Sequence, residues 1–253
     1  MRHHLSHIAN IILLFFSSCA TSSLPLLTGL ELPAITDSST IVKHVGYTAS
    51  FNSKYMIPNW VAYELTSDEL KGTVRRPSNS PFQTDPDYRG RQPERRDYSN
   101  SGWDKGHLAP DADMKWSEQA MIESFYFTNV CPQDHNFNAG DWEQLEELAR
   151  RLARRKGSLY IICGPIVTNN TNGKLGQHKV TIPDSFFKAF LYKDTDGYHS
   201  IAYLIPNKQT GQPLSNYSLT VNDLEAMIGL DLFTHLDPAI QETVESQLIL
   251  SDW

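Results

Sequence analysis

Runs of β-branched and aromatic residues, which favour an extended backbone, recur along most of the chain. We predict strands over 41–52, 59–66, 125–130 (a buried strand ending at Val130), 158–165, 179–193 and 198–206. Most of these strands are long enough to pair antiparallel, and few helices separate them. The pattern therefore predicts an α+β fold with a central, mainly antiparallel sheet flanked by helices.

Helical periodicity is strongest over 141–157, where charged residues lie opposite an apolar face and Gly157 provides a stop. The apolar positions are Trp142, Leu145, Leu148, Ala149 and Leu152. A short helix is predicted over 117–125. A late helix is predicted over 220–230, with Thr220 as its N-cap and Gly229 as its C-terminal stop.

The chain has 253 residues, which is enough to bury a core without disulfides or metals. Its net charge of −7 argues against a surface coated in positive charge for nucleic acid, although a local basic patch stays open. No internal repeat or low-complexity tract divides the chain, so 41–253 is predicted to be a single domain.

The first residues predict a secretory signal outside the fold. A basic start precedes an apolar run over 8–16, too short to span a bilayer stably, and then small residues. The letters FSSC resemble a bacterial lipobox, which predicts a lipoprotein signal peptide over 1–19 and lipidation of Cys19. Ordinary cleavage after Ala20 is the alternative. The protein is then exported, either as a membrane-anchored periplasmic or surface lipoprotein or as a secreted protein, and 20–40 forms a tether.

Two further cysteines, Cys131 and Cys163, follow the signal. Export permits a disulfide, but two cysteines make no framework, and Cys163 lies in a predicted buried strand. We therefore expect buried free thiols, with a pairing left open. The chain has no CxxC pattern, which argues against a structural zinc site.

Candidate chemistry begins in the polar stretch DKGHLAPDAD, at 104–113. The stretch is too polar for a core strand and too rich in Gly and Pro for a helix interior. Its histidine, His107, has no second His or Cys at metal-ligand spacing on the same element, which makes it a poor zinc ligand. Taken alone, a loop histidine of this kind is most often a surface residue.

The irregular, proline-containing segment 71–105 leads into this histidine. It carries eight basic and five acidic residues, a net charge of +3 in an otherwise acidic protein. Two interpretations stay open. The segment is a solvated loop, or its nearness to His107 makes it a surface that contacts phosphate groups.

A second polar cluster lies in 129–146, around a predicted loop over 131–140. Asn138 stands at the start of the predicted helix and Glu146 eight residues later, roughly 80° apart around the helix axis. An amide oxygen and a carboxylate on one side of a helix suit Mg²⁺, which keeps most of its water molecules. Taken alone, Asn138 is more simply a helix N-cap, and Glu146 is more simply a residue on a solvated helix face.

Four motifs follow one another along the chain: DKGHLAPDADM, TNVCPQDHNFNAGDWEQLE, CGP and TIPDSFFKAF. In sequence and in order they resemble the motifs of the DNA/RNA non-specific endonuclease family, over 42–233, with Asn138, Trp142 and Glu146 in matching register. The resemblance implies a ββα-metal, or His-Me finger, site. It also implies a Mg²⁺-dependent endonuclease, with Mn²⁺ as a substitute ion, that cuts DNA and RNA with low sequence specificity and leaves 5′-phosphate ends.

The same resemblance implies roles for the matching residues. His107 would be the general base that deprotonates the attacking water. Asn138 would be the direct protein ligand of the ion, and Glu146 would hold water molecules of its shell. Asn129 matches an asparagine beside the site and is taken as catalytic.

Basic residues are expected to contact the phosphate. Arg75 best matches the arginine that steadies the phosphate in the family, with Arg76 as its rival. Substrate contacts are expected from Lys105, Arg76, Arg95 and Arg96. The family commonly has Arg where this chain has Lys105, and lysine loses the bidentate contact to phosphate.

Two acidic residues, Asp111 and Asp113, add negative charge beside His107. They are either helpers of the outer metal shell or, as we favour, structural residues of a turn. Two other functions stay open: a nuclease restricted to one nucleic acid, and an exported protein that binds nucleic acid without cutting it. The intact set of candidate catalytic residues argues against the second, because a binder need not keep them. The sequence does not indicate the oligomeric state.

Overall fold

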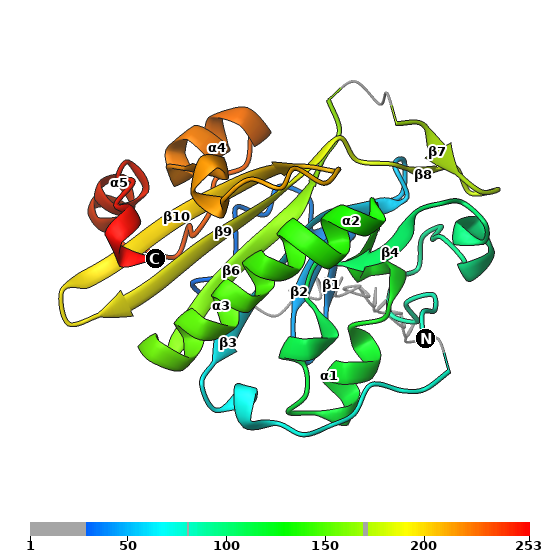
Figure 1. The fold of residues 1–253 in the computed structure, drawn as a ribbon, viewed down its shortest axis with the longest axis horizontal. Coiled ribbons are helices and arrows are strands. Elements are labelled where there is room, and N and C mark those ends of the chain that lie inside the picture. The colour runs from blue at the N-terminus through cyan, green and yellow to red at the C-terminus, as the bar shows by residue number, and fades with distance from the viewer. Residues whose placement is uncertain (1–28, 80, 169–171) are drawn as a thin grey trace, which may run out of the picture.

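A seven-stranded sheet forms the centre of the molecule, in the strand order β1-β2-β3-β6-β9-β10-β11 (Figure 1). The computed structural model describes residues 29–79, 81–168 and 172–253. The strands of this sheet are β1 (Ile41–Lys43), β2 (Thr48–Asn52), β3 (Ile57–Thr66), β6 (Ser158–Ile166), β9 (Ser185–Asp194), β10 (Gly197–Pro206) and β11 (Ser218–Leu219). All neighbouring pairs run antiparallel, so the predicted α+β class with a mainly antiparallel sheet is confirmed.

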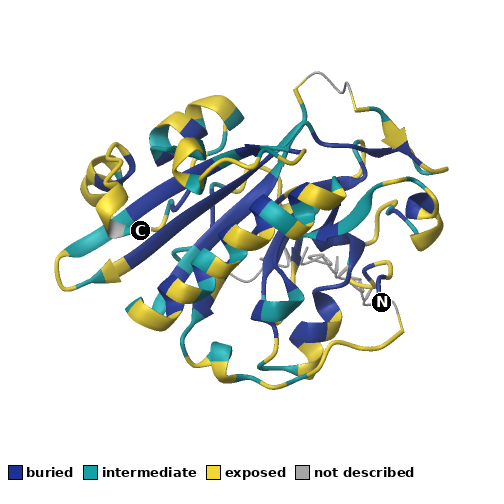
Figure 2. Ribbon diagram, in the orientation of Figure 1, coloured by how far each residue is buried: buried dark blue, intermediate teal, exposed yellow. Residues whose placement is uncertain are grey.

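The sheet is buried on both faces, under different helices (Figure 2). On β3, Val61 belongs to one core cluster and Ala62 to the other, as the two-residue period of a strand requires. Helix α3 (Glu143–Lys156) covers the first face. Helices α4 (Val221–Ile228) and α5 (Pro238–Glu245) pack against β10 and bury the second face.

A ββα unit lies beside the sheet. Its two strands, β4 (Asp104–His107) and β5 (Val130–Gln133), pair antiparallel, with His107 opposite Val130. The chain then enters α2 (His135–Phe137), a π-helical turn at Asn138–Trp142 and α3 without a break. The unit carries the predicted histidine on a strand and the predicted metal ligands on the adjoining helix.

Both helix ends predicted from glycine are confirmed. Gly157 follows α3 at φ 89° and Gly229 follows α4 at φ 65°, both in backbone conformations that side chains disfavour. The Thr220 hydroxyl accepts from the amide of Asp223 and caps α4, as predicted. The short predicted helix is α1 (Glu118–Glu123).

Two of the predicted strands are divided. The segment 41–52 is a hairpin of β1 and β2 around a short turn. Within 179–193, β8 (Val180–Thr181) pairs with β7 (Lys174–Leu175), and β9 begins only after Pro183. Proline has no N–H to donate to a strand partner, so it separates β8 from β9.

The strand predicted over 125–130 is not formed. Phe127–Asn129 is a 3-10 turn, and β5 begins at Val130 where the prediction ended a strand. The amide of Phe127 donates to the carbonyl of Gln83, so a contact distant in sequence sets this backbone. The prediction was wrong because buried aromatic residues favour a strand in sequence, whereas here they reach the core from a turn. The predicted loop over 131–140 is instead β5, α2 and the start of the π-helical turn.

The end of the predicted tether lies against the domain. Leu32 is 2% exposed, and the amide of Ala34 donates to the carbonyl of Asp231 at 2.8 Å. The predicted signal peptide and Cys19 lie outside the described residues. In the part of the chain that the structure covers, no helix is long and apolar enough to cross a bilayer.

Candidate active site

The polar stretch around the Gly-His pair is a short strand, not the irregular segment expected. In β4 the side chain of Gln133, on the paired strand β5, lies against the Cα of Gly106. A side chain at this position would collide with Gln133, so the pairing requires glycine. Gly106 thus lets β4 approach β5 closely and presents His107 at the end of the strand.

The imidazole of His107 is packed between two aromatic rings. Its centroid lies 5.2 Å from that of Phe82 and 5.0 Å from that of Phe125, the latter in an edge-on arrangement. The Nε2 atom is buried and has no hydrogen-bond partner among the described residues. Burial lowers the pKa of His107 to about 4, against the opposing effect of Asp111, and Arg76 lowers it further. The ring is therefore neutral at physiological pH, and its Nε2 atom is left without a protein partner.

The two candidate phosphate arginines are placed differently. The Arg76 guanidinium lies 5.0 Å from the centroid of the Phe125 ring and 3.8 Å from the Asp111 carboxylate. The Phe125 ring also contacts His107, so Arg76 belongs to the immediate surroundings of the imidazole. Arg75 is exposed and forms no ion pair with any described residue. The geometry favours Arg76 over Arg75.

Asn129 is completely buried beneath the site, with every hydrogen-bonding group of its amide engaged. Its oxygen accepts from the amide of Ala109 at 2.9 Å, and its NH₂ donates to the carbonyls of Ala109 and Ser124 at 2.8 and 2.7 Å. Asn129 therefore fixes the backbone two residues after His107. We interpret Asn129 as a positioning residue, because its oxygen and both N–H groups already have protein partners.

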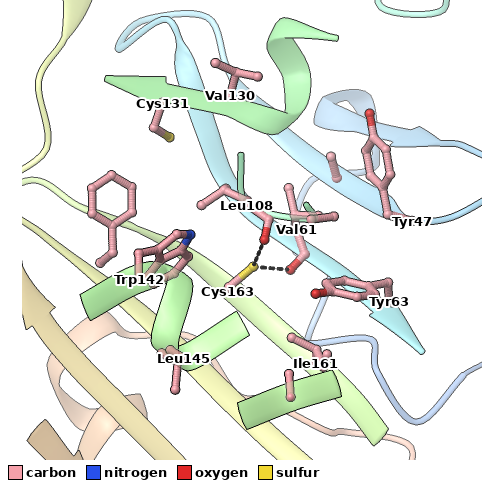
Figure 3. Close-up of a cluster of buried hydrophobic side chains, with 14 of the residues drawn as sticks. Tyr47, Val61, Tyr63, Leu108, Val130, Cys131, Trp142, Leu145, Ile161 and Cys163 are labelled. Atoms are coloured by element: carbon pink, nitrogen blue, oxygen red, sulfur yellow. Dashed lines mark hydrogen bonds between the residues drawn. The ribbon is translucent and has the colours of Figure 1, made fainter. Parts of the chain in front are cut away.

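The backbone after His107 is held from the sheet side as well. The indole N–H of Trp142 donates to the carbonyl of His107 at 3.1 Å. Lys188, fully buried on β9, donates to the carbonyl of Leu108 at 3.3 Å and lies 4.3 Å from the Trp142 ring centroid. The Cys163 thiol donates to the same carbonyl (Figure 3). Helix α3 and the central sheet thus both anchor the catalytic strand.

Both cysteines are buried free thiols, as expected. Burial raises the pKa of Cys163 to about 12 and that of Cys131 well above its ordinary value. Neither thiol is poised to act as a nucleophile.

Asn138 lies at the junction of α2 and the π-helical turn, next to β4. Its NH₂ donates to the Asp104 carboxylate at 2.9 Å, and the same carboxylate oxygen is 2.9 Å from Nδ1 of His135. The contact with Asp104 thereby sets the orientation of the Asn138 amide, with its NH₂ group toward Asp104. The amide oxygen is left as an acceptor, the form needed to bind a cation.

The π-helical turn changes how Asn138 and Glu146 are related. In an uninterrupted α-helix the two side chains would be roughly 80° apart around the axis. A π-helical turn contains about one extra residue, which takes back roughly 100° of rotation. The offset falls to roughly 20°, so both side chains come to the same face of the helix.

Glu146 carries the perturbed carboxyl expected of a buried acid. Its pKa is raised to about 8, chiefly by loss of solvation. Lys188 and Arg150 act against this rise, and Asp113 adds to it. Asp113 is itself buried and accepts from the Tyr63 hydroxyl at 2.9 Å and from Arg150 at 3.1 Å. The structural interpretation of Asp113 is therefore supported.

These oxygen donors fit a hard divalent cation. The Asn138 oxygen has a fixed orientation, and Glu146 is an acid whose charged form a nearby cation would favour. Amide and carboxylate oxygens on one helix face are ligands that Mg²⁺ accepts while keeping most of its water molecules. The residues present are thus compatible with the metal that the sequence resemblance implies.

Of the remaining basic candidates, Lys105 also lies against the Phe82 ring. Lys105 Nζ is 5.4 Å from the Phe82 ring centroid, and burial lowers its pKa, as does nearby Arg95. Arg95 and Arg96 are exposed on a 3-10 turn, where Arg96 pairs with Glu94 at 2.9 Å. Lys105 and Arg95 therefore extend the positive surface beside His107, while the charge of Arg96 is partly compensated.

The profile of the DNA/RNA non-specific endonuclease family matches residues 33–239. The chain belongs to this family. The family membership expected from the motifs is confirmed, and the ββα unit described above carries the first two of them.

Among similar proteins, the chain is 33% identical over 228 residues to the mitochondrial nuclease EXOG of Danio rerio, covering 83% of this chain and 64% of that protein. It is 32% identical over 222 residues to a nuclease of Nostoc sp., covering 84% of this chain and 79% of that protein. A solved EndoG/EndoGI complex matches with a TM-score of 0.69 and 26% identity, over 78% of this chain and 86% of that one. The chain spans less than two thirds of the length of the EXOG relatives.

Two charged residues beside this candidate site, Arg150 and Lys188, were not predicted from the sequence. Arg150 lies among several arginines of α3, and among the described residues it is the one of them that bonds Asp113. Lys188 did carry a signal, since a lysine inside the apolar run FFKAFLY must be buried or break the strand pattern. What its ammonium group contacts could not be read from that pattern.

Proposed function

We propose that this chain is a metal-dependent endonuclease that hydrolyses phosphodiester bonds of DNA and RNA with low sequence specificity and leaves 5′-phosphate ends. One observation carries the proposal. His107 presents a buried, unpartnered Nε2 atom on a strand that Asn138 and Trp142 tie to the adjoining helix. Family membership and the nuclease relatives support the same activity.

His107 is suited to act as the general base. Because burial lowers its pKa to about 4, the imidazole is neutral at pH 7 and can accept a proton from water. The resulting hydroxide attacks phosphorus and the bond to the 3′ oxygen breaks. That oxygen takes a proton from water and leaves as a 3′-hydroxyl, and the phosphate stays on the 5′ oxygen of the next nucleotide. The Trp142 and Asn129 contacts hold the imidazole-bearing backbone in place for this transfer.

The other residues bind the metal and the phosphate. Asn138 would hold Mg²⁺ through its amide oxygen and Glu146 through water; Mn²⁺ would be accepted by the same donors. When bound, the ion supplies positive charge at the phosphate and at the leaving oxygen. Arg76, whose planar guanidinium matches phosphate geometry, would steady the scissile group, and Lys105 would contact the strand nearby.

A cleavage assay tests the proposal. The full chain and a His107→Ala variant are incubated with supercoiled plasmid, single-stranded DNA and RNA, with Mg²⁺ or with EDTA. We expect cutting of all three by the unmodified chain, almost none by the variant, and none in EDTA. Cleavage of only one substrate would indicate the restricted enzyme. Binding without cleavage would refute the proposal in favour of the non-cutting binder.

We also propose that the protein is exported and anchored through Cys19, because residues 1–19 carry the pattern of a lipoprotein signal. The expected test result is partition into detergent, lost in Cys19→Ser. Several acyl chains are needed for stable anchoring, since one chain holds only weakly. A mature N-terminus at Thr21 would show ordinary cleavage and overturn the anchor.

A further inference from the structure

A second group of potential metal ligands lies away from the His107 site. His44 follows β1, and Glu123 is the last residue of α1. Asp85 and Asp87 lie in the segment 71–105 of net positive charge, called the basic loop below. One ligand atom from each of His44, Asp85 and Asp87 falls within 4.8 Å of the others. The group shares no residue with the proposed Mg²⁺ ligands Asn138 and Glu146.

The orientation of His44 is set by Asp85. Its Nε2 atom lies 2.8 Å from the Asp85 carboxylate, which also accepts from the Thr128 hydroxyl at 2.5 Å and the Asp87 amide at 2.9 Å. With Asp85 accepting from Nε2–H, Nδ1 is the ring nitrogen of His44 that can offer a lone pair to a metal ion. A carboxylate that fixes the tautomer of a histidine in this way is the usual companion of a metal-bound imidazole.

The free nitrogen of His44 has no protein partner. The side chain is 0% exposed, and Nδ1 is buried without a hydrogen bond among the described residues. Nδ1 instead faces two carboxylates, at 4.0 Å from Asp87 and 3.9 Å from Glu123. These separations are too long for hydrogen bonds. A buried acceptor left unpaired costs free energy, which a bound cation would remove.

The charge of the group is also uncompensated. Within the described ranges, His44 is the only ion-pair partner of Asp85, Asp87 and Glu123. Glu123 uses one oxygen for the Val45 amide and one for Gln119, and each oxygen can accept a second contact. Three carboxylates around one imidazole therefore create a local site of negative charge.

We propose that His44 Nδ1, Asp87 and Glu123 bind a divalent transition-metal ion of the Zn²⁺ type, with Asp85 orienting His44 and water completing the shell. Imidazole with carboxylates suits Zn²⁺, whereas Mg²⁺ prefers oxygen ligands alone. Ligands about 2.1 Å from a tetrahedral ion lie roughly 3.4 Å apart, so each carboxylate needs to approach Nδ1 by about half an ångström, and Asp87 must also move toward Glu123. Asp87, whose side chain is 67% exposed, is free to make this movement.

The position of the site gives the ion a structural role. It would join the end of β1, the basic loop and α1. From Asp85 the contacts lead through Thr128 to the next residue, Asn129, which fixes the backbone at Ala109. Binding of the ion should therefore stabilise the support of the catalytic strand, without taking part in the reaction.

The test uses Zn²⁺ alone, in the full chain carrying Asn138→Ala so that the proposed Mg²⁺ site is weakened. In this background Asp87→Asn is compared with Asp196→Asn, an exposed aspartate in the β9–β10 turn. Both proteins keep His3, His4 and His7, so any Zn²⁺ bound by those residues cancels in the comparison. Binding is measured by calorimetry and by the shift in melting temperature, with Mg²⁺ as the comparison ion.

We expect the Asp196→Asn protein to bind one more Zn²⁺ than the Asp87→Asn protein, or to bind it roughly 10- to 100-fold more tightly, and to gain more in melting temperature. Both proteins should melt at similar temperatures without metal, because Asp87 is exposed. Equal Zn²⁺ binding by the two proteins would overturn the proposal. An equal response to Mg²⁺ and Zn²⁺ would overturn the assignment to a transition metal.

Discussion

Replacing Asn129 with alanine separates a positioning role from a catalytic one. The amide makes three buried hydrogen bonds, two to the backbone of Ala109 and one to the carbonyl of Ser124. Alanine removes all three partners at once. The side chain is 0% exposed, so water cannot replace them without opening the structure.

The magnitude follows from the three groups left without a partner. An unsatisfied buried polar group costs about 1–3 kcal/mol, so three groups, allowing for partial relaxation, cost roughly 3–6 kcal/mol. A domain is stable by only about 5–15 kcal/mol. For a chain of this size each kcal/mol shifts the melting temperature by about 2–4 °C, so we expect a decrease of about 10 °C or more.

Urea denaturation followed by tryptophan fluorescence gives the free energy of unfolding, and calorimetry gives the melting temperature. Asn59→Ala is the matched control, because Asn59 is exposed and its amide bonds only to Asn52 and Ser50 side chains. That variant should lose less than about 1 kcal/mol. If Asn129→Ala abolished cleavage while unfolding like the control, the positioning role would be refuted and Asn129 would be catalytic.

Three further outcomes follow from the charges around His107. Because the pKa of His107 is lowered to about 4, the imidazole stays neutral well below pH 6.5. At saturating Mg²⁺, kcat/KM should therefore stay level as the pH falls through 6.5. A decrease in kcat/KM centred at pH 6.5 or above would contradict this. Arg76→Ala should lower kcat more than it changes KM, with Arg75→Ala close to the unmodified enzyme; the reverse order in steady-state kinetics would restore Arg75. The double variant Arg95→Ala/Arg96→Ala should reduce the slope of log binding constant against log salt by about one unit per lost phosphate contact, and an unchanged slope would make the loop ordinary surface.

Regular parts of the fold could be predicted because a simple pattern determines them. The long strands β3, β6, β9 and β10 are rich in residues that favour extended backbone, and their alternate residues fill two different cores. The segment 125–133 could not be predicted in this way. Its backbone is decided by a bond from Phe127 to Gln83, which lies far away in the sequence.

Candidate site residues were found by a different route. His107, Asn138 and Glu146 came from matching motifs, and each alone had a simpler structural interpretation. The sequence placed Asn138 and Glu146 roughly 80° apart on one side of the helix, and it did not indicate the π-helical turn that brings them closer, since such a turn leaves no clear mark in residue type. The choice between Arg75 and Arg76 stayed open for a related reason. Neighbouring arginines in an irregular loop differ only in direction, which the Phe125 ring and Asp111 determine.

Lys188 offers the strictest test of how the buried charges support the proposed metal site. Burial raises the pKa of Glu146 to about 8, and the ammonium group of Lys188 is one of the charges that limit this rise. In Lys188→Met the side chain keeps its length and loses the charge, so Glu146 should hold its proton to a still higher pH. Mg²⁺ must then displace that proton, and the Mg²⁺ concentration for half-maximal cleavage should rise roughly 10- to 100-fold at pH 7.

The Mg²⁺ concentration for half-maximal cleavage by Lys188→Met should fall again as the pH is raised, because deprotonation of Glu146 restores the ligand. The control is Lys193→Met, on the same strand, where the lysine is exposed and lies 5.1 Å from the Tyr198 ring. A merely structural lysine would lower stability and activity together at every pH. A Mg²⁺ requirement in Lys188→Met that matched Lys193→Met from pH 6 to 9 would therefore show that Lys188 does not act through Glu146.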